Sequence, residues 1–172
     1  MGWWSEEILG GDMPMDTIIE LQEMANIKVD DDKFGFTKRS LRKHLEQFID
    51  YARCTRMSER EVTYQVVGEL CIRTGLPLTT GEKELFSKYA KDSDIKNWGD
   101  INDRRARKQC IDTWATSIEN LPLVTYHIIR DGVYEGDKWG VYHSKKEVTQ
   151  AIKHYVDNVP GLKWKAKKVI TK

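Results

Sequence analysis

The sequence predicts an α+β fold, with a helical bundle over residues 1–121 and a β-β-α-β unit over residues 122–172. Two observations predict this division. Up to residue 121, apolar residues recur every three or four positions, which is the period of an amphipathic helix. Beyond it, the chain becomes rich in β-branched and aromatic residues, which is typical of strands. We expect the unit to pack on the bundle, so that the 172 residues form one globular body.

The first three helices of the bundle have recognisable starts and stops. Asp16 is the expected N-cap of a helix that runs to about residue 26. The second helix covers residues 37–53. Ser58 and Glu61 form a capping box that starts the third helix, and Gly75 ends it. Gly68 lies inside that helix and indicates close packing there, because glycine in a helix costs up to about 1 kcal/mol relative to alanine.

Two more helices complete the bundle. Thr79 and Glu82 form a capping box that opens the fourth helix, and the fifth covers about residues 102–120 before Pro122. The apolar spacing places one set of residues of the fifth helix inward: Ala106, Cys110, Trp114, Ile118 and Leu121. We expect the basic residues of the same helix on a solvated outer face: Arg104, Arg105, Arg107 and Lys108.

The last fifty residues read as a hairpin, a helix and a final strand. The hairpin is expected to turn at Glu135–Gly136. Ser144 caps the helix that follows, and the sequence "LKWKAKKVI" alternates apolar residues and lysine as a strand does.

Composition places the chain among cytoplasmic globular proteins. Hydrophobic residues make up 40% and charged residues 32% of the sequence, and no apolar run approaches the roughly 20 residues of a spanning helix. No secretion signal is visible. Cys54, Cys71 and Cys110 lie at apolar helical positions and are expected to be buried free thiols of a reducing compartment. We therefore expect no membrane association and no cofactor.

Charge is unevenly distributed, although the net charge is only +1. Residues 138–172 carry nine lysines against Glu147 and Asp157, whereas the preceding residues are net acidic. A row of lysines on one face of the last strand can follow phosphates. The candidate nucleic-acid-binding residues are Lys145, Lys153, Lys163, Trp164, Lys165, Lys167 and Lys168. The alternative is that lysines on an edge strand only prevent aggregation.

Two other groups are candidates for chemistry. If the hairpin turns as expected, His127 and His143 face each other and can begin a metal site, with His154 as a third ligand. The alternative is ordinary histidines on a half-exposed sheet. Asp12 and Asp16 can form an acidic cluster, but helix capping is the favoured reading because no histidine lies nearby in the sequence.

The opening "MGWWSEEILGGDMPMD" resembles that of domain-of-unknown-function family 4259, whose small bacterial members begin Met-Gly-x-Trp-Gly and continue with an apolar residue and two aspartates. Those places are taken here by Gly2, Trp4, Ile8, Asp12 and Asp16. Ser5 stands where the family has glycine. Similar segments follow in "VVGELCIRTGLPLT" and "DIKNWGDINDRRARKQCIDTW", so the resemblance covers residues 1–120. It implies a mostly helical cytoplasmic fold without an established activity.

The segments "GVYHSKKEV" and "VPGLKWKAK" resemble the hybrid-binding domain that precedes some ribonuclease H enzymes. The resemblance implies a compact β-β-α-β unit that binds RNA–DNA duplexes. Motifs for nucleotide binding, for a nucleophile elbow and for zinc are missing from the sequence, which favours a function without catalysis.

We therefore expect a small accessory protein of a bacterium or phage that binds another macromolecule, with phage–host conflict as one such role. A protein is the expected partner, and Trp3 and Trp4 are the candidate contact residues. The alternatives are a nucleic-acid-binding protein that uses the basic last strand, and an unfamiliar metal-dependent enzyme that uses His127 and His143.

Overall fold

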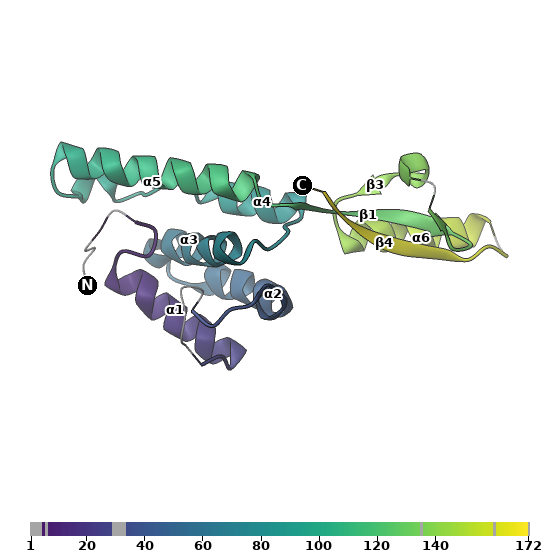
Figure 1. The fold of residues 1–172 in the computed structure, drawn as a ribbon, viewed down its shortest axis with the longest axis horizontal. Coiled ribbons are helices and arrows are strands. Elements are labelled where there is room, and N and C mark those ends of the chain that lie inside the picture. The colour runs from purple at the N-terminus through teal and green to yellow at the C-terminus, as the bar shows by residue number, and fades with distance from the viewer. Residues whose placement is uncertain (1–4, 6, 29–33, 135, 160, 172) are drawn as a thin grey trace. The chain divides into compact units, whose positions relative to one another are not determined.

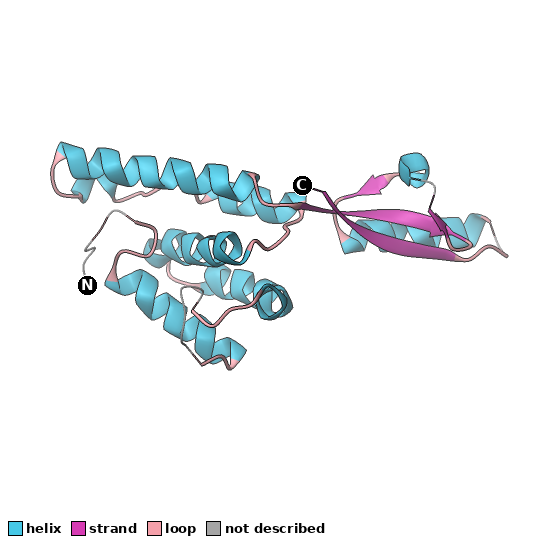
Figure 2. Ribbon diagram, viewed as in Figure 1, coloured by secondary structure: helices cyan, strands magenta, loops and turns pink. Residues whose placement is uncertain are grey.

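The chain has an α+β fold in a computed structural model that describes residues 5, 7–28, 34–134, 136–159 and 161–171 (Figures 1 and 2). It divides into two compact units. The first unit comprises Met1–Leu76 and Leu85–Leu121, and the second comprises Pro77–Glu84 and Pro122–Lys172. The change of sequence texture at residue 122 coincides with this division, but residues 77–84 join the second unit. That the two units form one body stays a prediction.

Five α-helices lie in the described residues before residue 122. Their bounds are α1 Asp12–Ala25, α2 Lys38–Cys54, α3 Met57–Thr74, α4 Thr80–Lys88 and α5 Ile101–Glu119, with a short 3-10 helix at Ile95–Asn97. Helix α3 is at the centre of the first unit, because α1, α2 and α5 all contact it. Val66, Val67 and Leu70 of α3 are fully buried. The division between the units falls inside α4.

Gly68 of α3 confirms the close packing that the sequence indicates. A Cβ atom added to it would lie 2.3 Å from Cζ2 of Trp114, a distance that real Cβ atoms do not reach. The glycine therefore lets the Trp114 indole of α5 rest directly on the backbone of α3.

The helix ends agree only in part with the expected caps. Gly75 adopts a left-handed conformation with φ of 61° and ends α3, as expected. The capping box of Thr79 and Glu82 is also confirmed, with N–H to oxygen distances of 2.7 and 3.3 Å. Asp16 is not a cap, because α1 already begins at Asp12.

The capping box of Ser58 and Glu61 is also wrong. Helix α3 begins at Met57 after Arg56, whose side chain makes no capping bond. The Glu61 carboxylate instead accepts hydrogen bonds from the Ser93 backbone N–H and hydroxyl, at 2.9 and 2.6 Å. The loop at Ser93, which is distant in the sequence, thus binds the Glu61 carboxylate that the capping-box pattern assigns to the start of α3.

The second unit is an antiparallel sheet covered on one face by helix α6 (Figure 1). Its elements are β1 Leu123–Arg130, β2 Val133–Tyr134, a 3-10 helix at Gly136–Trp139, β3 Val141–Tyr142, α6 Lys145–Asn158 and β4 Trp164–Thr171. Strand β1 pairs with β4 along its whole length and with the short β2 and β3 along its other edge. The Ser144 hydroxyl accepts from the Glu147 N–H at 3.2 Å, so Ser144 caps α6 as expected.

The hairpin turns earlier than expected. The turn is Asp131–Gly132, where both residues have positive φ, of 50° and 83°. Such a pair matches the twist of a two-residue hairpin, and Asp-Gly is a preferred sequence for it. Glu135 lies outside the described residues, and Gly136 begins the 3-10 helix that separates β2 from β3.

The second unit has its own apolar core. Ile128, Val148 and Trp164 are its buried residues, from β1, α6 and β4 respectively. Tyr155 stacks on Trp164 with ring centroids 4.9 Å apart, and Trp139 meets Trp164 edge to face at 5.4 Å. No helix in the described residues is long and apolar enough to cross a membrane.

Candidate nucleic-acid interface

The register of β4 separates its lysines from its tryptophan. Trp164 lies opposite Arg130, and Ala166 lies opposite Ile128, so both belong to the face that α6 covers. Because neighbouring residues of a strand point to opposite faces, Lys165 and Lys167 lie on the other face. The predicted alternation of the last strand is confirmed.

The lysines of the second unit lie at its surface. Lys165 and Lys167 repeat along the strand at roughly 6.5 Å, which is two residues of a β-strand. Lys163 lies just before β4, where its backbone N–H donates to Asp131 Oδ1 at 2.8 Å and its carbonyl accepts from the Asp131 N–H at 2.8 Å. The exposed lysines of the unit, in the described residues, are Lys138, Lys145, Lys146, Lys153, Lys163, Lys165, Lys167 and Lys168.

Tyr134 is an exposed aromatic residue on the lysine face of the sheet. The ammonium group of Lys167 lies 3.8 Å from the centroid of its ring, a cation–π contact. His127 meets the same ring edge to face, with centroids 5.6 Å apart. The tyrosine therefore fixes the position of Lys167 across the sheet.

His127 is buried on this face of the sheet and contacts the 3-10 helix that follows β2. Its Nδ1 lies 3.2 Å from Asp137 Oδ1, and its Nε2 lies 3.1 Å from the Thr125 hydroxyl oxygen. Tyr134 is a third neighbour, with its hydroxyl 3.4 Å from Nδ1. These contacts bind the 3-10 helix at Gly136–Trp139 to β1, and with it the chain that leads from β2 to β3.

Helix α6 supplies lysines to the opposite face of the unit. Lys145 is its first residue and Lys153 lies two turns further on, both exposed. Glu147 is the acidic residue in the first turn. A hydrogen bond from the His143 backbone N–H to Glu147 Oε2, at 3.0 Å, lowers the pKa of this carboxyl. The Glu147 carboxylate therefore accepts a backbone hydrogen bond at the start of α6.

Trp164 does not join the lysines as a contact residue. Its ring is buried among Tyr155, Trp139 and the apolar side of α6, so a base has no access to its face. The sequence pattern places Trp164 and the lysines on opposite faces, and the structure shows that the tryptophan side is the core. The lysines therefore carry the candidate interface.

The histidines do not form the expected pair. His127 lies opposite Val141 in the sheet, and Tyr126 lies opposite Tyr142. His143 therefore follows β3 two residues beyond the partner of His127. His143 Nδ1 lies 3.0 Å from the Thr80 hydroxyl, whereas His127 contacts Asp137. The 3-10 helix at Gly136–Trp139 separates β2 from β3, so β3 pairs with β1 in a register different from that of β2. His154 is near Asn158 of its own helix. The described residues contain no group of three metal-ligating side chains.

Two further expectations concern contact residues and thiols. Trp3 and Trp4, the candidate partner contacts, lie outside the described residues. All three cysteines are free, but only Cys71 is buried; Cys110 is half-buried and Cys54 is exposed. Sequence reasoning did not find Tyr134 or Asp137, and the signal available for them was only the aromatic and acidic character of the hairpin.

The fold and the interface define an α+β chain whose second unit presents lysines along an edge strand. Comparison with known proteins adds no name to this description: no family model, no curated protein and no solved structure matches the chain. The resemblances to domain-of-unknown-function family 4259 and to the hybrid-binding domain therefore stay predictions.

Proposed function

We propose that the chain binds nucleic acid through the lysine face of its second unit. The observation that carries this proposal is the row of Lys163, Lys165 and Lys167 beside an ordered strand, with Lys167 held in place by Tyr134. A regular row of ammonium groups on a rigid strand is suited to the phosphate backbone, which supplies most of the affinity of sequence-independent binding.

The structure offers less support for the two other functions considered, a protein-binding role and a metal-dependent enzyme. A protein partner was expected at Trp3 and Trp4, which lie outside the described residues. The alternative of a metal-dependent enzyme relied on His127 and His143, which contact different partners. The resemblance of Gly140–Lys167 to the hybrid-binding domain points to nucleic acid as well, so the test includes a duplex of that kind.

The experiment measures fluorescence anisotropy of labelled 20-base-pair probes (DNA duplex, RNA–DNA duplex) and of a 20-base single strand, at several salt concentrations. We expect binding by the wild-type chain that weakens linearly with salt on a double-logarithmic plot. The triple variant Lys163→Glu, Lys165→Glu, Lys167→Glu should lower the salt slope by about three, since each phosphate contact contributes about one.

A matched triple variant separates a local surface from net charge. Lys28→Glu, Lys43→Glu and Arg105→Glu change the charge by the same amount at exposed positions of the first unit. We expect these substitutions to leave most of the affinity in place. Absence of binding by the wild type at low salt, or an equal loss in both triple variants, would refute the proposal.

A further inference from the structure

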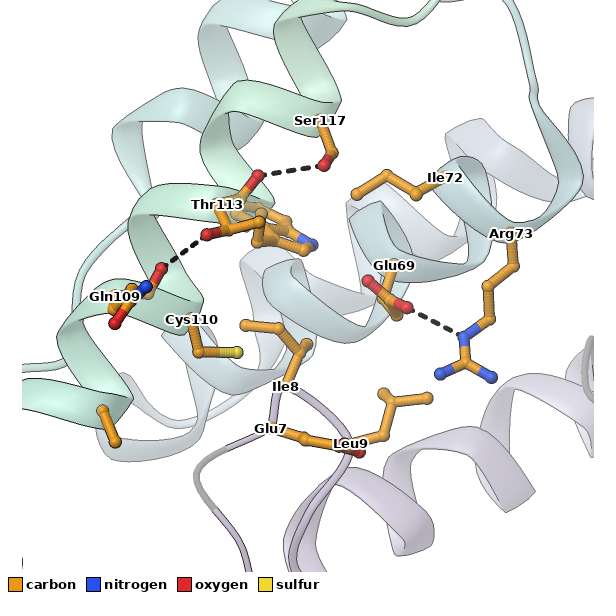
Figure 3. Close-up of a pocket in the computed structure, with 12 residues that line it drawn as sticks. Glu7, Ile8, Leu9, Glu69, Ile72, Arg73, Gln109, Cys110, Thr113 and Ser117 are labelled. Carbon is orange, nitrogen blue, oxygen red and sulfur yellow. Dashed lines mark hydrogen bonds and ion pairs between the residues drawn. The ribbon is translucent and has the colours of Figure 1, made fainter. Parts of the chain in front are cut away.

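A groove between α3 and α5 of the first unit differs in charge from the lysine face (Figure 3). Its volume is about 570 Å³, and Figure 3 shows Glu69 and Arg73 on α3 facing Cys110 on α5. Among its lining residues, Glu7 and Glu69 stand against the single cation Arg73. A phosphate backbone is a polyanion, so the groove does not attract it, whereas the lysine face of the second unit does.

The lysine face carries an aromatic ring beside its ammonium groups. Tyr134 of β2 lies opposite Ile129 of β1, and Ile129 lies opposite Lys165 of β4. Directly opposite residues of antiparallel strands point to the same face, so these three side chains form one row across the sheet. The next row consists of Val141, His127 and Lys167. The lysine face thus has an aromatic and an apolar side chain on one side of β1 and ammonium groups on the other.

The ring of Tyr134 is accessible and held in one orientation. The residue is 40% exposed, and its hydroxyl lies 3.4 Å from His127 Nδ1, which directs the tip of the ring toward β1. The Lys167 ammonium group lies 3.8 Å from the ring centroid, and Lys167 is itself exposed. The ring face beneath this ammonium group is therefore turned to solvent.

A nucleobase can take the place of the Lys167 ammonium group on this ring. Each base that stacks on an aromatic side chain strengthens single-strand binding about fivefold or more. The four-carbon stem of lysine is flexible, so the displaced ammonium group can move to a phosphate. A base offers its face for stacking only in a single strand, because its neighbours cover both faces in a duplex.

We propose that Tyr134 stacks a base of a single-stranded nucleic acid while Lys165 and Lys167 contact its phosphates. This inference rests on the proposed function and deepens it, because it names the form of nucleic acid that the lysine face fits. Bases and phosphates then contribute separately to the affinity, the bases through the ring and the phosphates through the ammonium groups.

The experiment measures fluorescence anisotropy of labelled probes with the full chain at low salt. The probes are a thymidine single strand, an abasic strand with the same number of phosphates, and a DNA duplex. We expect the wild-type chain to bind the thymidine strand about fivefold or more tightly than the abasic strand. Equal affinity for these two strands would overturn the inference and leave nucleic-acid binding itself in place. Absence of binding to every probe would refute the proposed function as well.

Substitutions on β2 locate the stacking ring. Tyr134→Ala should weaken binding of the thymidine strand about fivefold or more. The abasic strand and the duplex should lose a smaller factor, which reflects only the lost support of Lys167. Tyr134→Phe keeps the ring and should retain the wild-type affinities.

The matched control is Val133→Ala. Val133 is the neighbouring residue of the same strand, is 59% exposed and points to the opposite face. We expect it to leave the affinity for every probe unchanged. If Tyr134→Ala weakened all probes by the same factor, the tyrosine would only position Lys167, and base stacking would be contradicted.

Discussion

Arg107 is a buried guanidinium that joins distant segments of the first unit. Its Nε lies 3.2 Å from Asp92 Oδ2, and its terminal nitrogens donate to Gln65 Oε1 at 3.1 Å and to the Glu7 carbonyl at 2.8 Å. Burial lowers the pKa of Arg107, and the Asp92 carboxylate opposes that shift. The cation stays charged because an arginine pKa begins far above neutral pH.

Removing this cation should destabilise the first unit strongly. Arg107→Ala removes the cation that pairs with Asp92 Oδ2 and the donor that binds Gln65 Oε1, and breaking a buried pair in this way costs about 3–5 kcal/mol. Urea unfolding followed by circular dichroism measures the change. The control is Arg105→Ala, an exposed site on the same helix, which we expect to stay within about 0.5 kcal/mol of the wild type. Equal midpoints for the two variants would show that Arg107 does not hold the unit together.

The burial of Arg107 could not be predicted from the sequence, and the reason is physical. Arg104, Arg105, Arg107 and Lys108 form a basic run that is ordinarily solvated, and we expected all of it outside. The acceptors that satisfy Arg107 lie 15, 42 and 100 positions away in the chain. Local periodicity contains no information about such partners, so it cannot distinguish a satisfied buried arginine from an exposed one.

The contact between α3 and α5 gives a test at the scale of helices. Gly68→Ala should destabilise the chain by about 1–3 kcal/mol, because the new Cβ meets the Trp114 ring and forces the helices apart. This loss outweighs the gain of up to about 1 kcal/mol that alanine has over glycine in a helix. Thermal unfolding of the variant measures the balance.

Gly81→Ala is the matched control for that prediction. Gly81 also lies in a helix, α4, and a Cβ added there meets nothing within 4 Å. We expect this substitution to leave the chain as stable as the wild type or to stabilise it by up to about 1 kcal/mol. If Gly68→Ala behaved like Gly81→Ala, the indole would not be resting on α3.

At the scale of elements, the sequence was most informative where a signal is local. The capping box at Thr79, the Ser144 cap and the left-handed Gly75 all occur where expected, because each rests on neighbours within a few residues. The Ser58 cap failed since Ser93, from a loop far along the chain, binds Glu61. The hairpin turn was misplaced because Asp131–Gly132 and Glu135–Gly136 offer competing turns, and the expectation chose the wrong one.

For the candidate interface, too, the local pattern was predictable from the sequence and the long-range contacts were not. The two-residue period of a strand places Lys165 and Lys167 on one face whatever the rest of the fold does, so this part is confirmed. The contacts of Tyr134 and Asp137 with His127 depend on how the hairpin folds back, which no short pattern encodes. The groove between α3 and α5 depends on packing between helices and was also beyond the sequence. Ala106 and Cys110, expected inward with Trp114, line its side; Ala106 is exposed and Cys110 half-buried, so the expectation is wrong for Ala106.

In the described residues each of the two units has buried apolar residues, and this has a measurable consequence. Val66 of α3 and Val148 of α6 are both fully buried, one in each unit. The core around Val148 is assembled from residues of the second unit alone, so that unit has contacts that do not depend on the first. Amide hydrogen exchange reports the free energy of such local openings, so it can follow the two units at the same time.

We expect Val148→Ala and Val66→Ala to act on different parts of the chain. Each removes two methyl groups from a packed site and should cost about 1–3 kcal/mol. With Val148→Ala, exchange should accelerate in β1, β4 and α6, while α2 and α3 keep the protection of the wild type. With Val66→Ala, the pattern should be reversed. Hydrogen exchange read by mass spectrometry measures both sets of peptides in one sample. Equal acceleration across both units in either variant would mean that the two cores unfold as one cooperative body, as the sequence-based expectation of a single globular body implies.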